Sequence, residues 1–320
     1  MRMYRIGIDL GGTNIAAAIV DNNFSIIKKK SIPTTVTEGG DRIVEDMAYL
    51  CRALCEESGI ALSQIDAIGI ASPGIANSRD GVVEYSCNLP LRHFPICQKL
   101  SDKLDGVETH VENDANAAAW GEAVAGAAKG TSNSVMITLG TGVGGGVIVD
   151  GKVYAGFNFA GAELGHIVIS VGGRPCGCGR RGCWEAYSSA TALINMTKEK
   201  LCECKEAGRE TLMESLAQNG VNGRVAFDAY EAGDKAAAEV IADYAYYLAC
   251  GITNIINLYQ PEILSIGGGI SGQGQGLLDL IMPTVKTESY GGDGTVTPTK
   301  VCIAELGNDA GIIGAAFLGI

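Results

Sequence analysis

The stretch that decides the fold is Tyr4–Asp21, which reads YRIGIDLGGTNIAAAIVD. Residues 4–10 form an apolar run that predicts a buried strand, and a glycine turn leads into a second apolar run, Ile15–Val20. After a polar turn at Asp21, the pattern predicts a third strand over Phe24–Lys30. Strands joined by such short turns pair with their neighbours, so the chain is predicted to begin as an antiparallel meander.

The same pattern returns in the second half of the chain. Thr138–Gly140 corresponds to Asp9–Gly11, and Val147–Asp150 then falls on Ala18–Asp21 without a gap. Residues 263–270 likewise resemble residues 67–74, a strand that ends in a glycine-rich turn. We infer a duplicated α/β protein in which each half is a mixed sheet with helices. The halves are expected to face each other across a cleft, where ligands commonly bind.

Apolar residues at helical spacing predict the helices. The predicted helices cover residues 39–58, 113 to about 128, 189–202, 209–218, 235–257 and 308–318. Cys51 and Cys55 lie four residues apart on the first of them and are interpreted as core residues. Cys202 and Cys204 lie in a charged segment that is interpreted as a solvated helix end.

Composition bounds the class of protein. The 320 residues are comfortable for two domains, and the net charge of −12 argues against a nucleic-acid partner. Eleven cysteines are an odd number for a disulfide framework, and a strand that begins at Tyr4 leaves no room for a signal peptide or a helix-turn-helix. We therefore expect a cytoplasmic protein with no membrane association. The sequence indicates no oligomeric state directly, and we expect a homodimer or a higher homo-oligomer.

Three glycine-rich turns suggest phosphate binding, because glycine lets backbone N–H groups converge on an anion. They are Gly11-Gly12-Thr13, Gly140–Gly146 and Gly267-Gly268-Gly269. One such turn could equally be a tight hairpin, whereas three at corresponding places favour an anion site. The second turn also fits G-x-G-x-x-G and G-x-x-x-x-G-K. Residues 147–149 read as a strand rather than a helix, and Val153 replaces the Ser/Thr of a P-loop, so both motifs are rejected.

A metal site is predicted in Gly161–Glu185, which reads GAELGHIVISVGGRPCGCGRRGCWE. His166, Cys176, Cys178 and Cys183 have the residue types and short spacing of a tetrahedral zinc site. The alternative is a set of core or unligated cysteines, but this glycine-rich loop has too few apolar residues to fold on a core of its own. Four protein ligands leave no open position, so the metal is expected to be structural. It would stiffen the neighbouring carboxylates of Glu163 and Glu185.

Two carboxylates stand at predicted strand ends. Asp9 precedes the first glycine turn and could hold magnesium against a polyphosphate, or could simply cap the turn. Asp114 lies between a strand and a helix, where an N-cap is the ordinary role, although Asn116 could cap instead. A carboxylate at this position could also accept the proton of a substrate hydroxyl.

These motifs together resemble the ROK family of repressors, open reading frames and sugar kinases. The resemblance covers almost the whole chain, and the zinc loop followed by Trp184-Glu185 is its most specific part. The residues that carry it are Asp9–Asn14, Glu112–Asn116, Leu139–Gly146, Gly161–His166, Cys176–Glu185 and Gly267–Ile270.

The resemblance implies an actin-like ATPase (ribonuclease H-like) fold of two domains. One domain would contain residues 1–116 with the helix 308–320 packed back on it, and the other residues 117–307 with the zinc loop 161–185. Asp114 would be the general base, and Asn113, Asp114, Glu163, His166 and Glu185 would contact the sugar. ATP with Mg²⁺ would be held by Asp9, Gly11, Gly12, Thr13, Asn14, Gly140, Thr141, Gly142, Gly144, Gly267, Gly268 and Gly269.

The expected activity is ATP-dependent phosphorylation of a hexose. Residues 88–96 and 224–233 resemble bacterial glucokinases of the family, which favours glucose phosphorylated at its 6-hydroxyl. N-acetylmannosamine, fructose and allose stay open as substrates, and polyphosphate stays open as a donor. A non-catalytic sugar-responsive regulator is the alternative from another class, and an assay of ATP turnover separates the two.

Overall fold

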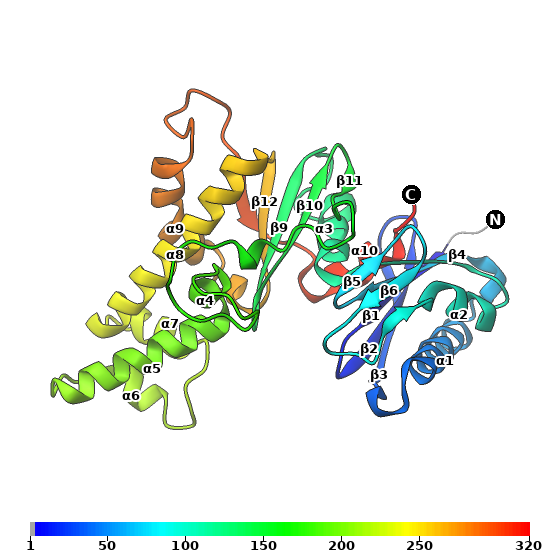
Figure 1. Ribbon diagram of the computed structural model, residues 1–320, viewed down its shortest axis with the longest axis horizontal. Coiled ribbons are helices and arrows are strands. Elements are labelled where there is room, and N and C mark those ends of the chain that lie inside the picture. Colours follow the sequence, from blue (N-terminus) through cyan, green and yellow to red (C-terminus); the bar gives the residue numbers. More distant parts are fainter. Residues whose placement is uncertain (1–3) are drawn as a thin grey trace. The chain divides into compact units, whose positions relative to one another are not determined.

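The computed structural model describes residues 4–320, which form two compact units (Figure 1). The first unit contains the chain up to Met136 together with Gly146–Ala162 and Ala304–Ile320. The second unit contains Ile137–Gly145 and Glu163–Ile303. The assignment of residues 1–116 with 308–320 to one domain and 117–307 to the other remains a prediction.

The first unit is built on a five-stranded sheet with the order β3-β2-β1-β4-β8. Its strands are β1 (Tyr4–Leu10), β2 (Asn14–Asp21), β3 (Ile26–Pro33), β4 (Ile65–Ser72) and β8 (Glu108–Asn113). β1, β2 and β3 form the predicted antiparallel meander, whereas β1, β4 and β8 run parallel. The carboxyl ends of the three parallel strands meet at one edge of the sheet, and Asp9, Ala71 and Glu112 lie there in one register row.

The third strand begins later than predicted, at Ile26 rather than Phe24. The turn before it is closed by the Asp21 carboxylate, which accepts the backbone N–H groups of Asn23 and Ser25. Phe24 takes a left-handed conformation (φ 63°) inside this turn, which ends the strand pattern, and its ring packs against Phe317. The hydrophobicity of Phe24 thus suggests a strand, whereas its contact with Phe317 is made from a turn.

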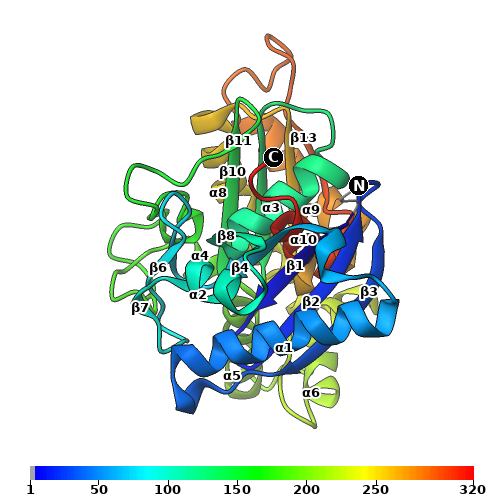
Figure 2. The same ribbon diagram turned by 90° about the vertical axis from the view of Figure 1, so that its right-hand side faces the viewer.

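One face of this sheet is covered by α1 (Gly40–Ser58) and α2 (Ile96–Lys103). Figure 2 shows α1 lying across β2 and β3. Its apolar residues recur every three to four positions, as an amphipathic helix requires, and they form the main core with the isoleucines of β1 and β4. Cys51 and Cys55 are buried in this core, which confirms their interpretation.

The other face is covered by α3 (Asp114–Ala125) and α10 (Ala310–Ala316), which pack closely through glycines. A methyl group on Gly7 or Gly69 would lie 1.9 or 1.7 Å from a carbonyl oxygen of α10. Between the two helices, a methyl group on Gly314 would lie 1.7 Å from the carbonyl oxygen of Ala117. Only glycine allows this approach, so glycine packing sets the position of the helix that begins at Asp114.

A small sheet, which the sequence analysis did not predict, lies between β4 and α2 in the chain. Its strands are β5 (Ile75–Asn77), β6 (Val82–Tyr85) and β7 (Arg92–Phe94), and they pair antiparallel in that order. Each strand has only three or four residues, too few for a periodic pattern to stand out.

The second five-stranded sheet has the order β11-β10-β9-β12-β13, which repeats the order of the first sheet position by position. Its strands are β9 (Ser134–Leu139), β10 (Val143–Val149), β11 (Lys152–Val153), β12 (Ile263–Gly267) and β13 (Lys300–Ile303). This repetition confirms the predicted α/β duplication. The second glycine turn leads into a strand, so rejecting the dinucleotide motif and the P-loop was correct.

The helices that follow in the chain include several of the predicted ones. They are α4 (Glu185–Ser188), α5 (Ala190–Glu206), α6 (Leu212–Leu216), α7 (Val225–Glu231), α8 (Lys235–Tyr259) and α9 (Gln275–Glu288). α9, which contains a proline at position 283, was not predicted. α6 covers Leu212–Leu216 and is shorter than the helix predicted over residues 209–218. Cys202 is exposed as predicted, but Cys204 is buried. In the described part of the chain, no helix combines the length and the apolar character needed to span a membrane.

Candidate active site

The first glycine turn joins β1 to β2 and leaves its tip exposed. The backbone N–H of Gly11 donates to the carbonyl oxygen of Asn14 over 2.9 Å, which closes the turn. Thr34, the residue after β3, holds it by donating its hydroxyl to the carbonyl of Gly11 and its N–H to the carbonyl of Thr13. Because these bonds occupy carbonyl groups, the exposed Gly12 and Thr13 keep their donor groups at the surface.

Asn113, rather than Asp114, caps the helix α3. Its side-chain oxygen accepts from the backbone N–H groups of Ala115 and Asn116, and its amide donates to the carbonyl of Gly74 over 3.1 Å. Asp114 is therefore not the N-cap of α3. Asn116, the alternative cap, does not fill that role either, because Asn113 does. Asp114 is the first residue of α3 and is exposed, with one carboxylate oxygen 2.9 Å from the N–H of Ala115.

Asp9 and Asp114 influence each other electrostatically. The pKa of the half-buried Asp9 is raised, first by burial, then by the charge of Asp114, while Lys29 lowers it. Both carboxylates therefore belong to one acidic region at the carboxyl edge of the first sheet. A divalent cation in this region would offset the free-energy cost of burying the Asp9 charge and the repulsion between the two carboxylates. The reason is that a nearby positive charge favours the ionised form of each group.

The second glycine turn is held by the start of α4 and α5 in the second unit. The backbone N–H of Ala190 donates to the carbonyl of Gly140 over 2.9 Å, and the hydroxyl of Thr191 donates to the carbonyl of Thr141 over 2.7 Å. The third turn lies beside it, because a methyl group on Gly268 would come within 2.6 Å of the backbone of Leu139. The structure thus brings two of the three predicted phosphate turns together.

Glu185 is bound to the same turn. Its Oε2 accepts from the backbone N–H of Val143 over 3.1 Å, and a methyl group on Gly142 would lie 2.2 Å from that oxygen. Glu185 follows Trp184, which is fully buried and donates from its indole N–H to the carbonyl of Tyr247 on α8. A predicted sugar contact is therefore fixed on one side by a core tryptophan and on the other by the glycine turn.

The segment from Glu163 to His166 lies against β10. Gly165 approaches the carbonyl oxygen of Val143 so closely that a methyl group would lie 2.1 Å from it, and Leu164 packs against Gly145. These two residues fix the short helix Leu164–His166 and leave Glu163 exposed at its start.

The four predicted metal ligands converge. The ligand atoms of His166, Cys176, Cys178 and Cys183 all lie within 4.8 Å of one another. The Sγ atoms of Cys178 and Cys183 are 3.7 Å apart, and Sγ of Cys176 is 3.8 Å from Nδ1 of His166. Zinc bonds of about 2.0–2.3 Å in a tetrahedron place neighbouring ligand atoms about 3.5–3.8 Å apart, so the spacing fits zinc.

The thiols of this cluster differ in acidity. The backbone N–H of Arg180 lowers the pKa of Cys178, whereas burial raises the pKa of Cys176 to about 12. Among these two, Cys178 ionises more readily, and the thiolate is the form that binds metal. Gly182, next to Cys183, lets the loop backbone pass close to Ser170, because a methyl group there would lie 1.7 Å from the carbonyl oxygen of Ser170.

Predicted residues of three kinds line one pocket of about 540 Å³ in the second unit. They are Thr141 of the glycine turn, Cys176 of the predicted metal ligands and Glu185. Two cations, Arg174 and Lys198, line the same pocket, and the sequence analysis missed both. Neither belongs to a motif, and only the packing of α5 beside the loop brings Lys198 there. A pocket with a hydroxyl, a carboxylate and two cations suits a ligand that carries both hydroxyl and phosphate groups.

The chain is similar to known proteins over almost its whole length. A family model described as "ROK family" matches residues 5–320. A glucokinase of Halalkalibacterium halodurans is 37% identical over 98% of this chain and 94% of its own length. An N-acetylmannosamine kinase of Citrobacter koseri is 31% identical over 99% of this chain and 98% of its own length.

A solved structure is similar over the whole chain as well. The crystal structure of a glucokinase from Streptomyces griseus, in complex with glucose and AMPPNP, superposes with a TM-score of 0.79 at 34% identity. The alignment covers 98% of both chains, so the likeness extends over the whole fold. The predicted actin-like fold class is therefore confirmed.

Proposed function

This chain belongs to the ROK family, and from that premise we propose that it is an ATP-dependent glucokinase. It transfers the γ-phosphoryl group of ATP to the 6-hydroxyl of glucose. The observation that carries the proposal is the match of 37% identity to a glucokinase over nearly the whole of both chains. The glucokinase of Streptomyces griseus, solved with glucose and AMPPNP, adds a relative of the same fold whose ligands are the proposed sugar and an analogue of ATP.

We assign the role of general base to Asp114. Phosphoryl transfer asks a protein for positioning, charge neutralisation and a group that accepts the proton of the attacking hydroxyl. Asn113 caps α3, so the neighbouring carboxylate of Asp114 is not needed as the cap. Its carboxylate is exposed at the start of α3, where a substrate hydroxyl can reach it.

The glycine turns are proposed to bind the nucleotide through backbone N–H groups. Gly11, Gly12, Thr13 and Asn14 would form one phosphate site, and Gly140, Thr141, Gly142 and Gly144 a second, with Gly267–Gly269 at the nucleoside. Support for the second site comes from the pocket that Thr141 shares with Arg174 and Lys198, since both cations suit a polyphosphate chain. Asp9 would hold Mg²⁺, which neutralises charge on the phosphates.

We propose zinc at His166, Cys176, Cys178 and Cys183, supported by ligand distances that suit a tetrahedron. The four ligands make a closed site, so the ion would stabilise the loop and supply no reacting group. The sulfur of Cys176 lies 3.5 Å from Oε1 of Glu185. A metal that fixes the cysteine loop would therefore also restrict the position of Glu185, which we propose as a sugar contact.

Glucose is proposed to be held by Asn113, Asp114, Glu163, His166 and Glu185. In His166, Nδ1 faces the sulfur of Cys176, so Nε2 is the nitrogen left for a sugar hydroxyl. Contacts of this polar kind discriminate strongly among sugars, because a missing hydroxyl leaves buried polar groups unpaired.

A kinase for N-acetylmannosamine is the second candidate, because such a kinase matches this chain at 31% identity over almost its full length. The deciding experiment is a coupled assay of ADP release with ATP, Mg²⁺ and a panel of glucose, N-acetylmannosamine, fructose and allose. The proposal expects the highest kcat/KM for glucose. A higher kcat/KM for another sugar would replace glucose, and sugar binding without ADP release would favour a non-catalytic regulator. Polyphosphate offered in place of ATP tests the donor.

The compartment and the assembly are part of the proposal as well. We place the protein in the cytoplasm, where ATP is supplied and a chain with eleven cysteines stays reduced. We propose a homodimer or higher homo-oligomer, which sedimentation of the purified protein measures directly.

A further inference from the structure

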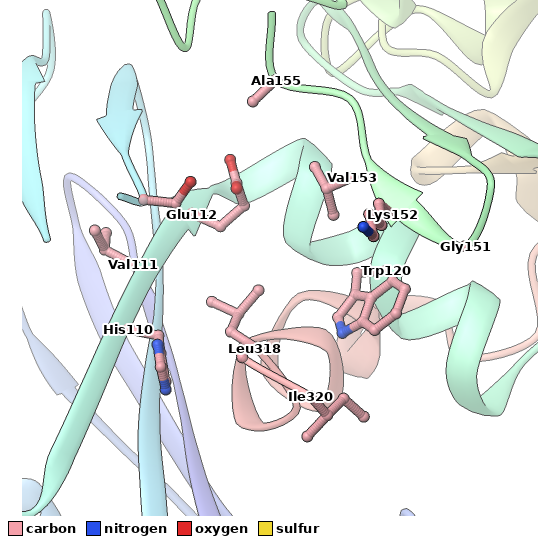
Figure 3. Close-up of a pocket in the computed structure, with 12 residues that line it drawn as sticks. His110, Val111, Glu112, Trp120, Gly151, Lys152, Val153, Ala155, Leu318 and Ile320 are labelled. Atoms are coloured by element: carbon pink, nitrogen blue, oxygen red, sulfur yellow. The ribbon is translucent and has the colours of Figure 1, made fainter. Parts of the chain in front are cut away.

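Glu112 is a buried carboxylate at the junction of β8 and α3, two residues before Asp114. Only 4% of its surface is exposed. Figure 3 shows its side chain where the strand runs into the helix, at the edge of a pocket that Trp120 and Leu318 also line. No local sequence pattern indicates a role for Glu112.

One oxygen of this carboxylate binds a residue on each side of the proposed base in the chain. Oε1 of Glu112 accepts from the backbone N–H of Asn113 over 2.9 Å and from the side-chain amide of Asn116 over 3.0 Å. Asn113 comes directly before Asp114 and Asn116 comes two residues after it. Asn116 has only 3% of its surface exposed, so this bond is shielded from water.

Burying a carboxylate is costly, and among the described residues the hydrogen bonds to Glu112 come from neutral donors. Burial raises the pKa of Glu112, and the groups that oppose this shift are the neutral donors Asn116, Asn113 and Ser78. An apolar side chain would fill the same space without that cost. The carboxylate is therefore explained by the two bonds that it makes around Asp114 rather than by packing.

We propose that Glu112 is a positioning residue for the phosphoryl transfer, because its Oε1 fixes the first turn of α3 and thereby the direction of the Asp114 carboxylate. This inference rests on the proposed role of Asp114 as base. Small errors in the placement of a base lower the rate steeply, since proton transfer requires hydrogen-bond geometry.

The same helix carries a matched control at its other end. Glu122 is fully buried, and its carboxylate accepts from the backbone N–H groups of Ala127, Glu305 and Leu306 at 2.7–3.1 Å. It lies eight residues after Asp114, roughly 12 Å away along the helix axis. Glu122 thus resembles Glu112 in burial and bonding but has no contact with the first turn of α3.

The test compares Glu112→Gln, Glu112→Ala, Glu122→Ala and Asp114→Asn by kcat and KM at saturating cosubstrate and by Tm. Glu112→Gln keeps an oxygen that accepts both bonds, so kcat should stay within about twofold of wild type. Glu112→Ala should lower kcat by about tenfold to a hundredfold with little change in the KM for ATP. Glu122→Ala should lower Tm but leave kcat within about twofold.

A double variant shows whether Glu112 acts through Asp114. Glu112→Ala should cost no further activity when Asp114 is already Asn, because coupled residues are not additive. A further fall would overturn the inference, as would wild-type kcat in Glu112→Ala or an equal loss of kcat in Glu122→Ala. Should Glu112→Ala not fold, Asn116→Ala removes one of the two bonds and must lower kcat. Full activity of Asp114→Asn would instead refute the base assignment itself.

Discussion

The backbone N–H of Val143 donates to Oε2 of Glu185 over 3.1 Å. This bond joins the second glycine turn, proposed to bind phosphate, to a carboxylate proposed to bind sugar. The two residues are 42 positions apart in the sequence, and the four predicted metal ligands lie between them. The approach is possible because Gly142 has no side chain, since a methyl group there would lie 2.2 Å from the same oxygen.

Gly142→Ala is expected to displace Glu185. The added methyl group cannot be accommodated without moving either the carboxylate or the turn. We expect the KM for glucose to rise by about tenfold or more, a loss of roughly 1.4 kcal/mol of binding. Initial rates at varied glucose measure it. Gly276→Ala, where nothing lies within 4 Å of the added methyl group, is the control. An unchanged KM for glucose would show that Glu185 does not hold the sugar.

Cys178→Ala is expected to lower the zinc content of the purified protein and to weaken glucose binding. Loss of one of four ligands opens the site, and the loop has little packing of its own to replace it. Elemental analysis should find about one zinc per wild-type chain and clearly less in the variant. Cys202→Ala, at an exposed cysteine outside the cluster, should leave zinc and activity unchanged. A metal-free wild-type protein would remove zinc from the proposal.

Asp114→Asn is expected to keep glucose binding and lose turnover. The amide preserves the shape of the side chain but cannot accept the hydroxyl proton, and general-base catalysis contributes about 10²–10⁴-fold to the rate. Calorimetry with glucose and the coupled ADP assay measure the two properties separately. Asp105→Asn, at an exposed position, is the control. A variant that turns over at nearly the wild-type rate would show that another group accepts the proton.

Asp9→Asn is expected to stabilise the fold while impairing catalysis. Burial and the charge of Asp114 raise the pKa of Asp9, so ionising this carboxyl group lowers the stability of the folded chain. The variant should gain its full stability over wild type above the pKa that Asp9 has in the folded chain. This gain should vanish as the pH falls to 3.8, the ordinary pKa of an aspartate. Tm measured across this range without Mg²⁺ tests the sign. A variant less stable than wild type near neutral pH contradicts the electrostatic account.

Gly314→Ala is expected to destabilise the first unit. A methyl group at this position of α10 would lie 1.7 Å from the carbonyl oxygen of Ala117 on α3. Overpacking against backbone cannot relax easily, and we expect a loss of about 3 kcal/mol, or roughly 6–12 °C in Tm. Gly311→Ala lies on the same helix, where the added methyl group contacts nothing within 4 Å. Equal Tm values for the two variants would disprove the close packing of α3 on α10.

Much of the site could be predicted because its residues come in local patterns. His166 and the three cysteines lie within 18 positions of sequence, and short spacing forces their ligand atoms together. Asp9 and Asp114 each stand where a strand ends, and parallel pairing of β1, β4 and β8 brings those ends to one edge. Glu112, Arg174 and Lys198 were missed because their roles depend on neighbours that no local pattern names.

The amino-acid sequence by itself determined the meander, its repetition in the second half and the clustering of His166 with the three cysteines, because each depends on residues close together in the chain. Tertiary structure alone decided that Asn113 caps α3, that Glu112 is buried against Asn116, and that Glu185 reaches the N–H of Val143. The physical reason is that a hydrogen bond between distant segments depends on how closely their backbones approach. Here glycines set that approach at positions such as Gly142 and Gly314, whose purpose appears only when the packed neighbour is known.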